Sequence, residues 1–285
     1  MKLHQPTSEI YVWDQRPVAE ALSRTTHLAI CAHQDDIEIL ATHGILECFH
    51  HPGRAFSGVV VTDGAGSARD FEYADYTDEQ MKAVRRTEQK KAAFVGEFSA
   101  QFLLDHPSRL VKDPAETLVV HELTRVLEAT RPEVVYTHNL CDKHDTHIAV
   151  VLRTIAALRA LAPEHRPQQV IGCEVWRDLD WVPDELKVVM DVTRHENLQA
   201  ALLGVFDSQI AGGKRYDLAA LGRRKAHSTF SESHGVDKTQ GLIYGVDLMP
   251  LVTDSNLDPG AFAARLIQAF HEEVTARVAR LVRLA

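Results

Sequence analysis

The sequence lacks the features that mark several protein classes. Its four cysteines, Cys31, Cys48, Cys141 and Cys173, are scattered without a CxxC pair, which argues against a disulfide framework and against a cysteine-rich zinc site. No apolar run approaches the roughly 20 residues of a membrane-spanning helix, and the N-terminus has no apolar segment typical of a signal peptide. We therefore expect a cytoplasmic protein that has no membrane partner.

An excess of positive charge is also absent. The chain has 31 Lys and Arg residues against 40 Asp and Glu residues, a net charge of −9. Proteins that bind nucleic acid or anionic membranes need clustered positive charge, so we expect no nucleic-acid partner. The 285 residues, 45% of them hydrophobic, suffice for a core without disulfides. No long linker divides them, so we expect a single domain over residues 1–285.

Short apolar runs alternate with helical patterns, which predicts an α/β fold with a mostly parallel sheet covered by helices on both faces. The expected strands are residues 27–33, 56–64, 101–106, 133–139, 168–176 and 187–193. Expected helices cover 37–49, 114–130, 148–161, 195–206 and 214–227, and one begins near Asp78 with a capping-box pattern at Thr77 and Gln80. A terminal amphipathic helix has apolar positions at Leu266, Phe270, Val274, Val278, Leu281 and Leu284.

The segment His33-Gln34-Asp35-Asp36 directly follows the first expected strand. In parallel α/β sheets, ligands bind beyond the carboxyl ends of the strands. An imidazole and two adjacent carboxylates at such an end can supply two metal ligands and one free base. The structural alternative is that Asp35 or Asp36 only caps the following helix.

A second polar segment, residues 138–147, follows the fourth expected strand and contains three histidines and two aspartates. Two histidines and one carboxylate form an open Zn²⁺ site with a position for water, whose pKa falls to about 7. His144 and His147 are three residues apart and share a helix face if a helix begins there. Spacing alone does not decide which of His138, His144 and His147 binds the metal, and a pair of surface histidines is the alternative.

Other segments are candidates for substrate binding. Asp63 follows the second strand in a Thr-Asp-Gly turn, which either presents backbone amides to substrate or is only a turn. Arg85, with Glu88, falls within the apolar stripe of its helix, as an arginine that reaches substrate hydroxyls or as a structural ion pair. Trp176 and Trp181 share an acidic loop and either stack on a sugar or belong to the core or an oligomer contact.

Two basic segments lie further along the chain. Residues 212–216, Gly-Gly-Lys-Arg-Tyr, and the run Arg223-Arg224-Lys225 could meet an acidic substrate or a phosphate. A solvated helix face is the ordinary explanation of such a run.

Taken together, the motifs resemble those of the PIG-L/LmbE-like family of metal-dependent N-deacetylases. Ala32-His33-Gln34-Asp35-Asp36 is similar to the family's Ala-His-Pro-Asp-Asp, and residues 62–64 match its Thr-Asp-Gly. The further matches are Arg85-x-x-Glu88, then Thr137-His138-Asn139 with His144-Asp145-Thr146-His147, and Ser208-Gln209. The resemblance covers about residues 27–210 and leaves a more variable C-terminal part. It implies a Rossmann-like sheet, and no GxGxxG follows the first strand to suggest NAD.

The resemblance implies a role for each matched residue. His33, Asp36 and His147 are the expected ligands of one Zn²⁺, with Fe²⁺ as the alternative metal, Asp35 is the general base and His144 is the acid. Arg85 is the expected sugar-binding arginine. Two positions differ from the family pattern: Gln34 replaces a proline, and Thr146 replaces the aspartate that tunes the acid histidine. Asp145 or Asp142 is the candidate substitute for that aspartate.

The sequence therefore predicts a zinc-dependent hydrolase that removes acetyl from a small-molecule amino sugar of the N-acetylglucosamine type. One alternative is an amidase on a different amide, such as a thiol-sugar conjugate. The other is a non-catalytic sugar-binding protein on the same fold, against which the complete acid–base set argues. The sequence does not decide between a monomer and a homo-oligomer.

Overall fold

The computed structural model, which describes residues 1–282, contains an eight-stranded sheet in the order β1-β4-β3-β2-β5-β6-β8-β7. Neighbouring strands from β4 to β6 run parallel, whereas β1, β8 and β7 pair antiparallel with their neighbours. The fold is thus the mostly parallel α/β sheet that the sequence predicts. The strands are β1 (Glu9–Tyr11), β2 (His27–Cys31), β3 (Phe56–Thr62), β4 (Ala100–His106), β5 (Val134–His138), β6 (Gln169–Cys173), β7 (Lys187–Asp191) and β8 (Leu242–Asp247).

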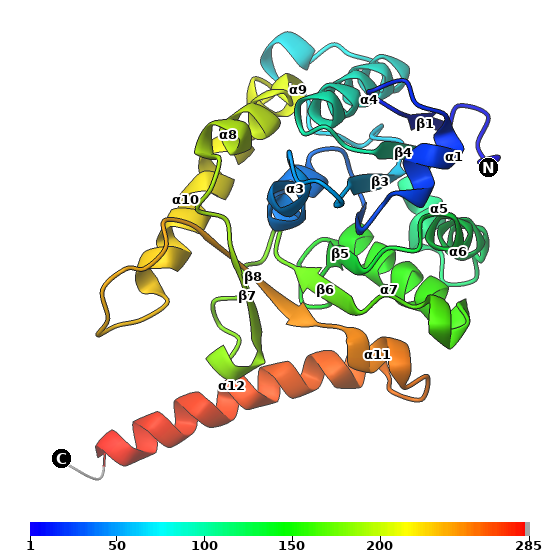
Figure 1. Cartoon of the computed structure of the whole chain (residues 1–285). Coiled ribbons are helices and arrows are strands. Elements are labelled where there is room, and N and C mark those ends of the chain that lie inside the picture. Colours follow the sequence, from blue (N-terminus) through cyan, green and yellow to red (C-terminus); the bar gives the residue numbers. More distant parts are fainter. Residues whose placement is uncertain (283–285) are drawn as a thin grey trace.

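Helices cover both faces of the sheet (Figure 1). One core cluster joins Ile30 and Val135 of the strands to α1, α6, α7, α11 and α12, and the other joins Ala29 and Tyr136 to α2, α3, α4 and α8. Successive strand residues therefore pack on opposite faces, as expected for strands buried on both sides. The helices are α1 (Val18–Ser23), α2 (Asp36–Leu40), α3 (Thr42–Cys48), α4 (Asp78–Val95), α5 (Ser108–Lys112), α6 (Leu118–Thr130), α7 (Asp145–Ala160), α8 (Glu196–Gly204), α9 (Asp207–Ile210), α10 (Tyr216–Phe230), α11 (Met249–Thr253) and α12 (Pro259–Val282).

All six strands expected from the sequence are present, and α4 begins with the predicted capping box of Thr77 and Gln80. The prediction lacked β1 and the short helices α1, α5, α9 and α11, and it differs from the structure in two further details. The single helix expected over 37–49 is divided into α2 and α3, because Arg224 takes the carbonyl oxygens of Glu38 and Ile39 as hydrogen-bond acceptors. Strand β8 was not predicted, although it separates β6 from β7 and makes this end of the sheet antiparallel.

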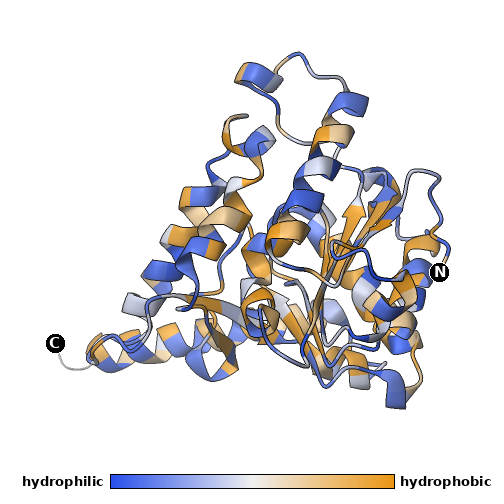
Figure 2. Cartoon of the chain, turned by 45° about the horizontal axis from the view of Figure 1, so that its top comes forward, coloured by the Kyte–Doolittle hydropathy of each residue, from blue (hydrophilic) through white to orange (hydrophobic). Residues whose placement is uncertain are grey.

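The terminal helix α12 extends away from the body of the molecule, and apolar residues recur along it (Figure 2). Its Leu266 is buried in the core, whereas Val274 and Val278 are exposed. Leu284, also predicted for this helix, lies outside the described residues. No helix within residues 1–282 combines the length and hydrophobicity needed to cross a membrane.

Candidate metal and active site

The loop after β2 is held in place from both neighbouring strands. The backbone amide of Ala32 donates to Nε2 of His138 at the end of β5, and its carbonyl oxygen accepts from the amide and hydroxyl groups of Thr62 at the end of β3. At Asp35 the backbone adopts a left-handed conformation with φ of 81°, and α2 begins at the next residue. This sharp reversal places His33, Asp35 and Asp36 together at the carboxyl edge of the sheet.

Three side-chain atoms converge at this edge. Nδ1 of His33 lies 3.2 Å from Oδ2 of Asp36 and 3.2 Å from Nε2 of His147, and these last two atoms are 3.4 Å apart. Ligands bonded at about 2.1 Å to one tetrahedral ion lie roughly 3.3 Å from each other. The three expected ligand residues therefore form a triangle of the size that a single divalent ion requires, with no rearrangement of the chain.

The structure separates the three histidines of the second motif. Nε2 of His138 accepts the amide hydrogen of Ala32, so its lone pair is already used, and burial lowers the pKa of His138 well below its usual range. Its ring stacks on that of His147 at a centroid distance of 3.9 Å. His138 thus supports the loop and the ring of His147. Its Nε2 also lies 3.5 Å from Oδ2 of Asp36, whereas His147 contacts both His33 and Asp36.

Asp142 orients His147. Its Oδ2 lies 3.3 Å from Nδ1 of His147 and also accepts the amide hydrogen of Trp176. A carboxylate on one ring nitrogen fixes the tautomer that leaves the other nitrogen free for a metal. Although burial opposes it, the charges of Asp36 and Asp142 raise the pKa of His147 to about 9, so a proton and a metal ion compete for this nitrogen.

His144 has no carboxylate partner of the kind that Asp142 provides for His147, because Thr146 stands where the family pattern has an aspartate. Nδ1 of His144 accepts the backbone amide hydrogen of Thr146 at 3.3 Å, and burial lowers the pKa of His144 to about 4. The ring is therefore neutral and carries its proton on Nε2. Asp142 contacts His147 rather than this ring, and Asp145 is exposed, so neither takes the place of the family's aspartate beside the acid histidine.

Asp35 is buried beside the three ligand residues and lines the cavity. Burial, against the attraction of Arg85 and with the repulsion of Asp36, raises the pKa of Asp35 to about 6. Its Oδ2 accepts from Nη2 of Arg85 at 2.9 Å, whereas Oδ1 makes no hydrogen bond within the described residues. A carboxylate with a raised pKa and one free oxygen in a cavity has the properties of a general base.

Arg85, expected to bind a sugar, is almost completely buried and is bound by protein groups. It donates to Asp35, to the carbonyl oxygen of Gln34 and to Glu88. Glu88 in turn accepts from the amide and hydroxyl groups of Ser208, which gives the Ser-Gln motif a structural contact. The hydrogen-bonding groups of Arg85 are therefore directed to Asp35 and its neighbours rather than to a substrate.

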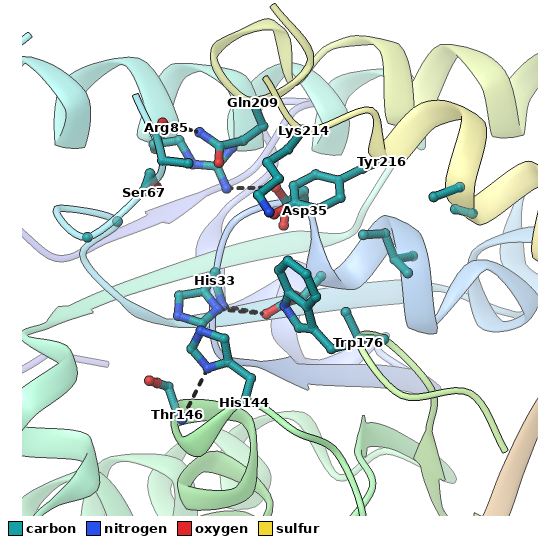
Figure 3. Close-up of a pocket in the computed structure, with 18 of the residues that line it drawn as sticks. His33, Asp35, Ser67, Arg85, His144, Thr146, Trp176, Gln209, Lys214 and Tyr216 are labelled. Atoms are coloured by element: carbon teal, nitrogen blue, oxygen red, sulfur yellow. Dashed lines mark hydrogen bonds and ion pairs between the residues drawn. The ribbon is translucent and has the colours of Figure 1, made fainter. Parts of the chain in front are cut away.

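The cavity above these groups has a volume of about 760 Å³, and His33, Asp35, Asp36, Arg85, His144 and Trp176 line it (Figure 3). The ring of Trp176 lies 6.3 Å from that of His144 and is stacked on it. Gly64 also lines the cavity, and a side chain there would approach Oε1 of Gln34 within 2.7 Å. The backbone of Gly64 has φ of 77°, a left-handed conformation that glycine adopts without strain, and this explains the glycine of the Thr-Asp-Gly turn.

Two residues expected at the substrate do not line the cavity. Asp63 forms an ion pair with Lys82 at 3.3 Å and accepts the amide hydrogen of Ala65. Trp181 donates from its indole to the carbonyl oxygen of Asp178 and packs edge-on against Phe270 of α12. Of the four predicted substrate-binding residues, only Arg85 and Trp176 face the cavity. The sequence alone could not separate the two tryptophans, because they share one loop.

The fold and the site together define an α/β protein with a His/Asp cluster suited to a metal ion at the carboxyl edge of its sheet. Residues 28–158 match the model of the PIG-L family, described as GlcNAc-PI de-N-acetylase. The resemblance to the PIG-L/LmbE-like family that the motifs indicate is therefore confirmed. The matched segment contains His33, Asp35, Asp36, His144 and His147. No curated protein sequence matches the chain.

Several solved structures share the fold. GalB, the 4-carboxy-2-hydroxymuconate hydratase from Pseudomonas putida KT2440, is 20% identical with a TM-score of 0.60, and the match covers 78% of this chain and 95% of that one. The N,N'-diacetylchitobiose deacetylase from Pyrococcus horikoshii is 17% identical with a TM-score of 0.60, and the match covers 78% of this chain and 84% of that one. The A40926 pseudoaglycone deacetylase Dbv21 is 14% identical with a TM-score of 0.55, and the match covers 79% of this chain and 97% of that one. A hydratase and deacetylases thus share this fold, so the reaction must be argued from the site.

Proposed function

We propose that the protein is a zinc-dependent hydrolase that removes the N-acetyl group from an N-acetylglucosamine-type sugar or conjugate. The observation that carries the proposal is the convergence of His33, Asp36 and His147 within 3.2 to 3.4 Å beside the free oxygen of Asp35. The match to the de-N-acetylase family model over 28–158 supports the same reaction.

His33, Asp36 and His147 would hold the ion. Zn²⁺ bound there supplies a Lewis acid and water that ionises near neutral pH. Fe²⁺ suits the same imidazole and carboxylate ligands, so the identity of the metal is part of the proposal.

The remaining steps belong to side chains of this protein. Asp35 accepts the proton of the attacking water at Oδ1, while Arg85 holds Oδ2 and keeps the carboxylate in place. His144 donates a hydrogen bond from Nε2 to the amide oxygen as negative charge develops there. The bond to the acetyl carbon forms from water, the C–N bond breaks, and the proton held by Asp35 passes to the leaving amine. The products are acetate and a free amino sugar.

The lowered pKa of His144 refines the role that the resemblance implies. A ring that is neutral at pH 7 stabilises the developing charge by a hydrogen bond and is a weak source of protons. Asp35, with a pKa of about 6, is the better donor to the amine once it has taken a proton. We therefore assign the return of the proton to Asp35 and oxyanion stabilisation to His144.

Acetate release tests the proposal. We would assay N-acetylglucosamine, its disaccharide and a set of N-acetylglucosaminides with metal-free protein to which Zn²⁺ or Fe²⁺ is restored. Acetate that depends on the metal and is lost in Asp35→Asn supports the hydrolase. Release of a larger acid from a different amide, or binding of the sugar without turnover by the metal-loaded protein, would replace the proposal with one of its two alternatives.

A further inference from the structure

The wall of the cavity outside the metal site is rich in positive charge. Five basic side chains line the cavity, namely Arg85, Lys112, Lys214, Arg215 and Arg223, against the two carboxylates Asp35 and Asp36. Both carboxylates are already used, one by Arg85 and the other by the histidine cluster. The remaining wall is therefore positive, in a chain whose net charge is −9.

The basic residues differ in whether a carboxylate neutralises them. Arg85 is bound by Asp35 and Glu88, and Arg215 makes two hydrogen bonds to Asp217. By contrast, Lys112, Lys214 and Arg223 form no ion pair with any residue in the part of the chain that the structure describes, residues 1–282. They are cations at a cavity wall whose charge no protein group balances.

Lys214 and Arg223 both lie close to Trp176. Nζ of Lys214 is 5.0 Å from the centre of the Trp176 ring, and Figure 3 shows the side chain reaching over the cavity toward Asp35. Nη1 of Arg223 donates to the carbonyl oxygen of Val175 at 2.6 Å, which fixes the guanidinium beside the same tryptophan. The rest of its donor groups remain available.

The backbone before α10 directs Lys214 to this position. Gly213 adopts φ of 101°, a conformation that glycine favours, and the amide of Lys214 donates to the carbonyl oxygen of Gln209 at 2.7 Å. The turn between α9 and α10 is thereby closed with its lysine on the cavity side.

The basic run 223–225 is not a uniform solvated helix face, which is the ordinary explanation of such a sequence. Arg224 is buried and donates to Gln199 and Thr42. Lys225 is exposed and pairs with Glu196, away from the cavity. Only Arg223 of the three lines the cavity, so consecutive charges have three different environments.

We propose that Lys214 and Arg223 bind an anionic group of the substrate, a carboxylate or a phosphate, while Trp176 packs against its ring. The inference rests on the proposed deacetylase function and names its substrate class: an N-acetyl sugar that carries a negatively charged group. Trp176, Lys214 and Arg223 lie outside residues 28–158, so this part of the site comes from the chain beyond the segment matched to the family.

The kinetic test compares neutral and charged substrates. N-acetylglucosamine, its 1-phosphate, its 6-phosphate and a carboxylate-bearing N-acetylglucosaminide would be assayed with wild type, Lys214→Gln, Lys214→Gln/Arg223→Gln and the control Lys225→Gln. We expect kcat/KM to be about tenfold or more higher for an anionic substrate. Lys214→Gln should remove most of that preference, because it should raise KM for the anionic substrate far more than KM for the neutral one, and Lys225→Gln should behave as wild type. Whichever of the phosphate-bearing and carboxylate-bearing substrates has the higher kcat/KM identifies the anionic group.

A binding test separates this inference from the proposed function. Calorimetry with Asp35→Asn protein would measure glucosamine 6-phosphate, glucosamine 1-phosphate, a carboxylate-bearing glucosaminide and uncharged glucosamine, with and without Lys214→Gln. Tighter binding of an anion that Lys214→Gln abolishes supports the inference even if no acetate is released from any substrate. Equal affinity for charged and uncharged ligands, or no binding of any anion, overturns it. Deacetylation of a neutral sugar that is as fast as that of every anionic sugar would leave the proposed function standing and overturn the anionic substrate.

Discussion

The floor and the outer wall of the cavity are built in different ways. On the floor, protein groups hold the reactive side chains in place: Asp35 is held by Arg85, His147 by Asp142, and the loop backbone by His138. On the outer wall, Trp176, Lys214 and Arg223 are partly or fully exposed and have few partners. Buried polar groups need such partners to remain charged and oriented, whereas exposed ones remain free to meet a ligand.

Under the proposed function, this difference assigns catalysis to the floor of the cavity and substrate recognition to its outer wall. The floor lies within the segment that matches the family model, and the named wall residues lie beyond it. A rigid floor suits a reaction that needs fixed geometry, and a wall with unused charges suits discrimination between substrates. The following predictions test that division, and the largest effects are expected at the floor.

Removal of a ligand should have the largest effect. In His147→Ala, one of the three converging atoms is lost, so we expect stoichiometric metal binding and metal-dependent turnover to disappear. Metal content by atomic emission and acetate release measure the two effects. The exposed His121 on α6 provides the control, because His121→Ala should change neither. Full metal occupancy in His147→Ala would remove His147 from the ligand set.

Asp35→Asn should have the next largest effect, because an amide cannot accept the proton from water. We expect a fall in kcat of about 10² to 10⁴, with metal content retained. Asp63→Asn is the matched control, since Asp63 is paired with Lys82 and does not line the cavity. An equal loss in both variants would show that the effect is structural and that the base lies elsewhere.

Arg85→Met should move the acid limb of the pH profile. The proposed base Asp35 must be ionised to act, and its pKa is about 6 because burial raises this pKa more than the Arg85 charge lowers it. Loss of that charge raises the pKa of Asp35 further. The pH below which activity is lost should therefore rise by about one unit. The pH dependence of kcat/KM measures the shift, and Arg85→Lys should restore part of it. An unmoved limb in folded Arg85→Met protein would contradict the role assigned to Arg85.

The smallest effect is expected at the wall. Trp176→Leu removes the ring beside His144, so we expect KM to rise about fivefold with kcat nearly unchanged. Trp181→Leu removes a ring that packs on Phe270, so it should lower the thermal unfolding midpoint without changing KM. The reverse pattern would restore Trp181 to the substrate site, as the sequence had suggested.

Much of the fold was accessible from periodicity and spacing. The parallel strands were found because each is a short apolar run buried on both faces, and the start of α4 was found because capping has a local signature at Thr77 and Gln80. Strand β8 was missed because its pairing with β6 and β7 depends on contacts distant in sequence. The division of α2 from α3 was missed for the same reason, since Arg224 lies far along the chain.

The sequence by itself determined the chemistry that is available: a histidine and two carboxylates after one strand, and three histidines after another, in a chain with an α/β pattern. Only the tertiary structure decided how those groups are used. It joined His147 rather than His138 to His33 and Asp36, turned Arg85 onto Asp35, left Asp63 and Trp181 outside the cavity, and brought Lys214 and Arg223 to Trp176. The physical reason is that side-chain type is local, whereas burial, hydrogen-bond partners and charge balance arise from residues that only folding brings together.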